Sequence, residues 1–161
     1  SSAASDVYKR QAVERLTGAG FQILHAYGRK NDAPATHDHY TAVPYIDDME
    51  AAYAVADVVV CRSGAMTVAE NSAAGIPAIY IPLPHGNGEQ GLNSAHLVDA
   101  GAALRIDDAA LSGDVLVDKL LPLVAPEARA TMRAALKDSG AGSVAEDLAA
   151  RIAAAAGKDT K

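Results

Sequence analysis

The chain has 161 residues, 50% of them hydrophobic, and its formal net charge is −6 at pH 7. A chain of this length can bury one core, and with one Phe and no Trp that core is aliphatic. The acidic balance argues against nucleic-acid partners and against direct contact with anionic membranes, and the single Cys61 excludes a disulfide framework.

The first third of the chain alternates helical and extended patterns. In chain order these predict a helix over 12–19, a strand over 21–26, a polar loop over 28–40, a strand over 41–45 and a helix over 47–55. Asp47 is the expected N-cap of the last helix, because its carboxylate can accept from the free N–H groups of the first turn.

The stretch 56–90 predicts a strand, a tight turn and a helix. Val58, Val59 and Val60 form a β-branched run typical of a strand buried on both faces of a parallel sheet. Arg62-Ser63-Gly64 breaks this run, helical spacing resumes over 66–74, and Gly75 is the expected C′ residue. The free N–H groups at 64–67 should therefore face the carboxyl edge of the sheet, where α/β proteins bind phosphates.

The alternation continues and then gives way to helices. We expect a strand over 78–81, a helix over 89–100 closed by Gly101, a strand over 102–106, and helices over 112–124, 126–138 and 143–156. Strands that alternate with helices predict an α/β fold, a Rossmann-like parallel sheet flanked by helices. The longest apolar run, 76–84, holds three prolines and is far shorter than the ~20 residues of a membrane-spanning helix.

Thr67 and Glu70 lie three residues apart on one helix face and allow two interpretations. In a capping box, the Thr hydroxyl and the Glu carboxylate satisfy each other's backbone donors and no ligand is involved. In a ligand site, Thr67 donates to a phosphate and Glu70 accepts both hydroxyls of a ribose, because a carboxylate has two acceptor oxygens and a cis-diol has two donors. The spacing does not decide between them.

The loop 85–88 leads into a second polar helix start, which carries Glu89, Gln90 and Asn93. Carboxamides both donate and accept hydrogen bonds, as sugar hydroxyls do, so amides with one carboxylate can bind a sugar. The alternative is ordinary capping and solvation of a first turn.

Four motifs in order resemble one known family. Tyr45-Ile46-Asp47-Asp48-Met49, CRSGAMTVAE, GIPAIYIPLP and GNGEQGLN are similar to the carboxyl-terminal half of the MurG family. The resemblance covers roughly 21–156 and is densest over 44–104, and IPLPHGNGEQ with the Ala-rich tail looks closest to actinobacterial members. It implies the carboxyl-terminal half of a GT-B glycosyltransferase that transfers N-acetylglucosamine from UDP-GlcNAc to lipid I, forming lipid II for peptidoglycan.

The resemblance also implies roles in holding the nucleotide. Main-chain groups at Ile46 would hold the uracil, and the amides of Ala65, Met66 and Thr67 the diphosphate, with the Thr67 hydroxyl assisting. Glu70 would take the ribose diol.

For the sugar, the resemblance implies that Gln90, with Glu89 and Asn93 beside it, binds the hydroxyls of N-acetylglucosamine. Arg62 occupies a position near the donor, and a salt bridge to a neighbouring acid is its simpler role. No metal and no cofactor are expected, because there is no Asp-x-Asp motif and no Cys pair or HExxH spacing supports the five His residues. Charge at a helix N-terminus would then stabilise the departing UDP.

Parts of the family pattern are missing from these residues. The family's GGSQGA turn, its amino-terminal domain, the acceptor site there and a candidate catalytic His have no counterpart, so no catalytic residue is assigned and the chain alone is expected to be inactive. SSAASDVYKRQ also has none. We therefore predict a non-native leader at 1–11, a UDP-GlcNAc-binding domain at 12–156 that is incomplete at its N-terminus, and a disordered tail at 157–161.

Two other functions share this nucleotide chemistry. One is a separate soluble donor-binding subunit of a split glycosyltransferase, and the other is a UDP-GlcNAc 2-epimerase-like GT-B domain, against which the CRSGAMTVAE and GNGEQ motifs argue. The predicted location is the cytoplasm, with the parent enzyme peripheral on the cytoplasmic face of the membrane. Lipid I would be reached through the missing domain, with no direct membrane contact from this half.

Overall fold

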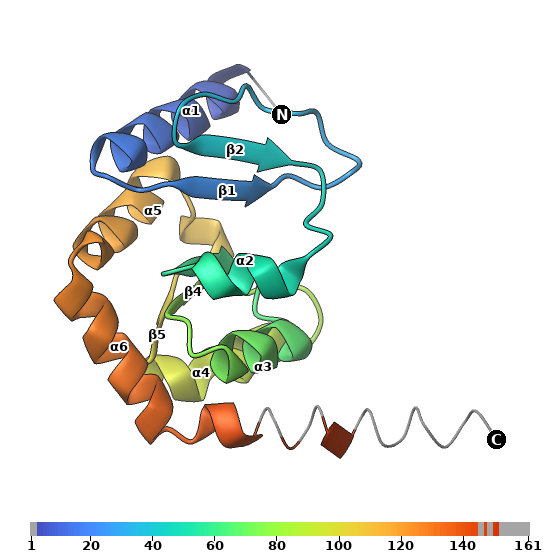
Figure 1. Ribbon diagram of the computed structural model, residues 1–161. Helices are drawn as coiled ribbons and strands as arrows, with labels where there is room; N and C mark the ends of the chain where they lie inside the picture. Colours follow the sequence, from blue (N-terminus) through green and yellow to red (C-terminus); the bar gives the residue numbers. More distant parts are fainter. Residues whose placement is uncertain (1–2, 145–146, 148–149, 152–161) are drawn as a thin grey trace.

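The computed structural model describes residues 3–144, 147, 150 and 151, and Figure 1 shows the arrangement of their helices and strands. The first elements are α1 (Ala3–Gly18), β1 (Ile23–Ala26), β2 (Tyr40–Val43), α2 (Met49–Val55), β3 (Val59–Cys61) and α3 (Ala65–Ala73). They are followed by β4 (Ala78–Tyr80), α4 (Glu89–Asp99), β5 (Ala103–Arg105), the 3₁₀ helix η1 (Asp108–Ala110), α5 (Gly113–Leu120), the 3₁₀ helix η2 (Leu121–Val124) and α6 (Pro126–Asp138).

All strand pairs are parallel, which confirms the predicted α/β fold class. The strands form two sheets, one of β1 and β2 and one in the order β3-β4-β5. Ile23 is opposite Tyr40 in the first sheet, and Val59 is opposite Ala78 in the second. Each sheet orders its strands as they follow in sequence. A loop connects β1 to β2, whereas the helices α3 and α4 return the chain from β3 to β4 and from β4 to β5.

Helices cover both faces of the three-stranded sheet, as the side chains of β4 and of Ile81 directly after it demonstrate. Ile79 and Ile81 belong to a core cluster with residues of α1, α5, η2 and α6. Ala78 and Tyr80 belong to a second cluster with residues of α3 and α4. Since successive side chains of a strand point to opposite faces, α1 and α5 lie on one face and α3 and α4 on the other.

Several boundaries differ from the sequence predictions. The N-cap of α2 is Asp48 and not Asp47, and its Oδ1 accepts from the Ala51 N–H at 2.9 Å. The predicted helix over 112–124 ends at Leu120 and continues as η2, because Pro122 has no N–H to donate. α1 begins at Ala3, within the segment 1–11, whose assignment as a leader stays a prediction.

The prediction that Val58–Val60 is buried on both faces was wrong: Val58 and Val59 are only partly buried, and Val60 is 38% exposed. The reason is the position of β3, which is an edge strand of its sheet. β4, the central strand, is buried along its whole length. The predicted helix over 143–156 and the tail at 157–161 lie mostly or wholly outside the described residues.

Candidate functional site

The turn between β3 and α3 presents a helix N-terminus, as the sequence predicts. Gly64 is the N-cap, and the first hydrogen bond of the helix runs from the Val68 N–H to the Gly64 carbonyl at 3.0 Å. The amides of Ala65, Met66 and Thr67 precede that first bond, so they are the orphan donors of the first turn. Gly75, with a φ of 68°, follows the C-cap and confirms the predicted end of the helix.

The capping-box interpretation of Thr67 and Glu70 was wrong. It requires Thr67 to be the N-cap, whereas Thr67 is a residue of the first turn of α3. The Glu70 carboxylate lies further along the helix, and its Oε2 accepts a hydrogen bond from the Tyr53 hydroxyl at 3.1 Å. Neither side chain therefore takes part in an N-terminal cap of α3.

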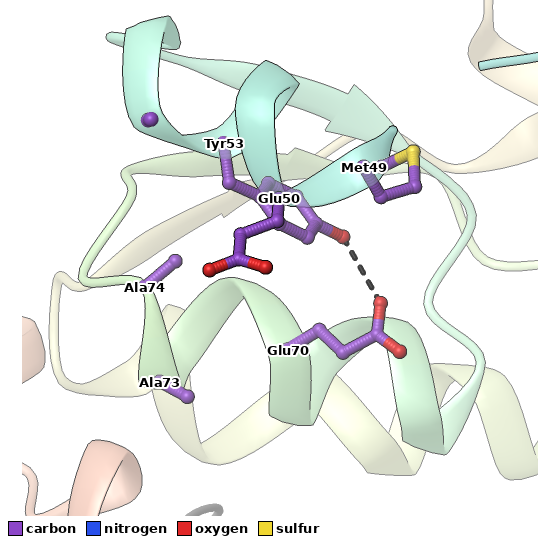
Figure 2. A pocket seen from close by; sticks show the side chains of 7 residues that line it. Met49, Glu50, Tyr53, Glu70, Ala73 and Ala74 are labelled. Atoms are coloured by element: carbon purple, nitrogen blue, oxygen red, sulfur yellow. Dashed lines mark hydrogen bonds between the residues drawn. The ribbon is translucent and has the colours of Figure 1, made fainter. Parts of the chain in front are cut away.

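A shallow cavity separates α2 from α3, and Glu70 borders it (Figure 2). Its volume is about 570 Å³, and its lining consists of Met49, Glu50, Tyr53, Ala54, Glu70, Ala73 and Ala74. Figure 2 shows Tyr53 reaching from α2 toward the carboxylate on α3. Burial, and after it the hydrogen bond to Glu70, raises the pKa of the Tyr53 hydroxyl to about 12, so the hydroxyl remains a donor at neutral pH.

The start of α4 is tied to the turn before α3 through Ser63, which has no exposed area. Its hydroxyl donates to the Gln90 carbonyl at 2.7 Å, and its own carbonyl accepts from the Asn93 Nδ2 at 3.0 Å. The Gln90 Oε1 accepts from the Leu83 N–H at 3.0 Å. The structure thus brings the two predicted helix starts together through the Gln90 carbonyl and the Asn93 carboxamide. The Gln90 carboxamide instead bonds within its own loop, to Leu83.

Arg62 has the simpler of its two predicted roles, a salt bridge. Its Nη1 pairs with Asp108 Oδ1 at 2.5 Å and also donates to the Ile81 carbonyl at 3.3 Å. These contacts join the end of β3 to β4 and to η1. A contact of Arg62 with a donor nucleotide stays a prediction.

Two further predicted residues, Ile46 and Glu89, lie in the loop before α2 and at the start of α4. Ile46 is half-buried in the loop between β2 and α2, and Glu89 is exposed in the first turn of α4. Sequence reasoning missed Tyr53, because nothing in the pattern of the helix over 47–55 indicated which of its residues would meet Glu70. It also treated Ser63 only as part of a strand-ending turn, although a Ser beside a helix start is a signal for a hydrogen-bonded connection.

Other reactive groups are less suited to chemistry. Burial raises the pKa of the Cys61 thiol, which disfavours the reactive thiolate. Across residues 3–144, 147, 150 and 151, no three His, Cys, Asp or Glu side chains gather closely enough to hold a metal ion. Among the helices that the structure describes, none combines the length and the apolar character needed to cross a membrane.

A family model and the sequences of known relatives both match this chain, and they point to the same family. The family model described as "Glycosyltransferase family 28 C-terminal domain" matches residues 3–152. A relative from Corynebacterium glutamicum is 56% identical over 145 residues, which are 89% of this chain and 41% of the relative. A relative from Mycolicibacterium smegmatis is 52% identical over 135 residues, which are 80% of this chain and 35% of the relative. Both are named UDP-N-acetylglucosamine: N-acetylmuramyl-(pentapeptide) pyrophosphoryl-undecaprenol N-acetylglucosamine transferase.

Solved structures of glycosyltransferases share the fold of this chain. Acinetobacter baumannii MurG superposes with a TM-score of 0.65 at 26% identity, over 90% of this chain and 46% of that one. The glycosyltransferase of kitacinnamycin shares the fold, with a TM-score of 0.62 at 22% identity, over 88% of this chain and 38% of that one. The chain spans less than half the length of the curated relatives that it matches. It belongs to the family of glycosyltransferase family 28 C-terminal domains, and the MurG resemblance of its motifs is confirmed.

Proposed function

We propose that this chain is the donor-binding half of a glycosyltransferase that transfers N-acetylglucosamine from UDP-GlcNAc to a lipid-linked N-acetylmuramyl-pentapeptide, the acceptor in the names of its relatives. The observation that carries the proposal is the start of α3, with its orphan amides at Ala65, Met66 and Thr67 and a carboxylate, Glu70, about one turn further on.

The diphosphate suits the amides, because a helix N-terminus supplies oriented N–H donors and a positive partial charge. Glu70 is unsuited to a phosphate, since two negative groups in contact repel each other. A ribose diol is a better partner: the Tyr53 hydroxyl donates to Oε2 only, so Oε1 and the remaining lone pairs can accept from both hydroxyls. We assign the base to main-chain groups at Ile46.

The sugar is assigned to the start of α4. Gln90 has its Oε1 bound to Leu83, which orients its NH₂ group, and Asn93 has its Nδ2 bound to Ser63, which orients its Oδ1. One oriented donor and one oriented acceptor suit the hydroxyls of a hexosamine. Glu89 adds a carboxylate in the same turn.

The acceptor and the membrane are assigned to the remainder of the full-length protein. We place the parent enzyme in the cytoplasm, peripheral on the inner face of the membrane, with no direct membrane contact from this acidic half. The positive end of α3 stabilises the departing UDP without a metal ion.

Glu70→Ala tests the ribose assignment. We expect UDP affinity to fall by about tenfold or more, because loss of a charged hydrogen-bond partner costs roughly 1.5–3 kcal/mol. Affinity for inorganic diphosphate should change little, since that ligand has no ribose. Isothermal titration calorimetry with both ligands measures the difference.

Glu50→Ala is the matched control, because Glu50 lines the same cavity and carries the same charge without a ribose assignment. Its UDP affinity should stay close to that of the parent chain. If the two substitutions shift the affinities for UDP and diphosphate by the same factors, Glu70 acts only through its charge and the proposal fails.

Tyr53→Phe tests whether Tyr53 positions Glu70. A net hydrogen bond is worth about 0.5–1.5 kcal/mol, so we expect UDP affinity to fall by about twofold to tenfold and diphosphate affinity to be unchanged. In the double variant with Glu70→Ala, loss of the hydroxyl should have no further effect, because its partner is already gone. Independent, additive losses in the calorimetric cycle would show that Tyr53 contributes by another route.

A further inference from the structure

Arg105 is the last residue of β5, and its side chain reaches the first turn of α4. We propose that Arg105 is a positioning residue for the donor sugar, because it packs against Gly91 and thereby holds the preceding residue, Gln90, in place. This inference rests on the proposed function, to which it adds a residue outside the four sequence motifs.

The contact between Arg105 and Gly91 is close. A Cβ atom at position 91 would lie 3.0 Å from Nη1, 3.5 Å from Nη2 and 3.6 Å from Cζ of Arg105, so the guanidinium group directly faces the glycine. The guanidinium is also fixed at its inner nitrogen, because Nε donates to Asp107 Oδ1 at 2.7 Å. Position 91 therefore has no room for a larger side chain while Arg105 stays where it is.

Neither residue suits a helix start by itself. Glycine within a helix is less favourable than alanine, because its backbone loses more freedom on folding. A cation near a helix N-terminus is unfavourable, since that end carries the positive part of the helix dipole. Two locally unfavourable residues in contact with each other indicate a role other than stabilising the helix.

The first turn of α4 depends on contacts from other elements. Its N-cap is Gly88, which has no side chain to accept from the free N–H groups of the turn. Leu83, in the loop after β4, donates its N–H to Gln90 Oε1 at 3.0 Å, and Arg105 contacts Gly91 from the end of β5. Because β4 and β5 pair in parallel, these two attachments of the turn have a fixed separation.

A cavity of about 280 Å³ borders the same contact. Its lining includes Leu83, Gly88 and Gly91 together with Arg105 and Asp107. Truncation of Arg105 would enlarge this space, so the first turn of α4 would lose a packing partner without gaining another. The NH₂ group of Gln90, which is assigned to the sugar, would then no longer be held in one position.

Arg105→Ala tests the inference by calorimetric titration with UDP and with UDP-GlcNAc. We define the sugar gain as the Kd for UDP divided by the Kd for UDP-GlcNAc, and we expect it to fall by about twofold to tenfold with the Kd for UDP unchanged. Arg15→Ala is the matched control, because Arg15 is similarly exposed and pairs with Asp114 at 2.9 Å. It should leave both affinities unchanged.

Gly91→Ala tests whether Arg105 acts through Gly91. The new methyl group would meet only the end of a flexible side chain, so it should displace the guanidinium without lowering the free energy of unfolding in urea. We expect the same loss of sugar gain as in Arg105→Ala, and no further loss in the double variant. Additive losses would mean that Arg105 contacts the sugar itself. Either that result or an unchanged sugar gain in Gly91→Ala overturns the positioning role.

Amide hydrogen exchange separates failure of this inference from failure of the proposed function. The Leu83 amide, which is bonded to Gln90 Oε1, should exchange roughly threefold faster or more in Arg105→Ala and at the parent rate in Arg15→Ala. If the unaltered chain shows no sugar gain, the sugar assignment fails, and exchange at Leu83 still decides whether Arg105 positions Gln90. An unchanged rate at Leu83 in Arg105→Ala overturns the inference.

Discussion

We expect the 161-residue chain alone to transfer no N-acetylglucosamine from UDP-GlcNAc to a lipid I analogue, with or without Mg²⁺. Holding the acceptor hydroxyl, a base and the anomeric carbon in reacting geometry can supply ~7–11 kcal/mol of the barrier, and the residues assigned here hold only the donor. His85, the imidazole nearest to the start of α4 in sequence, is exposed on the preceding loop, where a side chain is solvated.

Activity should return when the amino-terminal part of the Corynebacterium glutamicum relative is joined covalently ahead of this chain. A radiolabelled-sugar transfer assay on both proteins measures the difference, and Glu70→Ala in the joined protein serves as the control that turnover uses this donor site. Turnover by the unjoined chain that is lost in His85→Ala would falsify the assignment of this half to donor binding alone.

The largest effect on stability is expected from Ile79→Ala. Ile79 has no exposed area, lies in the middle of β4 and packs in the cluster shared by α1 and α5. Removing a large buried aliphatic side chain lowers the free energy of unfolding by about 2–5 kcal/mol, a large share of the roughly 5–15 kcal/mol typical of a domain. Urea denaturation followed by circular dichroism measures it.

Val55→Ala is the control for that substitution, because Val55 is 79% exposed at the end of α2. Its free energy of unfolding should stay within about 0.5 kcal/mol of the parent chain. Comparable losses for the two variants would mean that β4 is not the centre of the core.

The local features of the site could be predicted from sequence. The Val run, the break at Arg62-Ser63-Gly64 and the stop at Gly75 each act over a few residues, and the structure has the strand, turn and helix that they indicate. Strand alternation likewise predicted parallel pairing. These inferences succeeded because backbone propensity and hydrophobic periodicity are encoded by neighbours in the chain.

Long-range features could not be predicted. The Tyr53 hydroxyl meets Glu70 across 17 residues, and Ser63 meets Gln90 across 27, through helix packing that no local pattern specifies. The open edge of β3 was missed for a related reason. Composition indicates a strand suited to burial, but it does not state which neighbours are present to bury it.

The connection through Ser63 has a consequence for changing the donor of this enzyme family. Because the fully buried Ser63 bonds to both Gln90 and Asn93, the starts of α3 and α4 are held at a fixed spacing. A substitution at Asn93 meant to admit another sugar also releases the carbonyl of Ser63, directly before the N-cap of α3. Under the sugar assignment proposed above, engineering of sugar preference should therefore begin at Glu89, whose side chain is exposed.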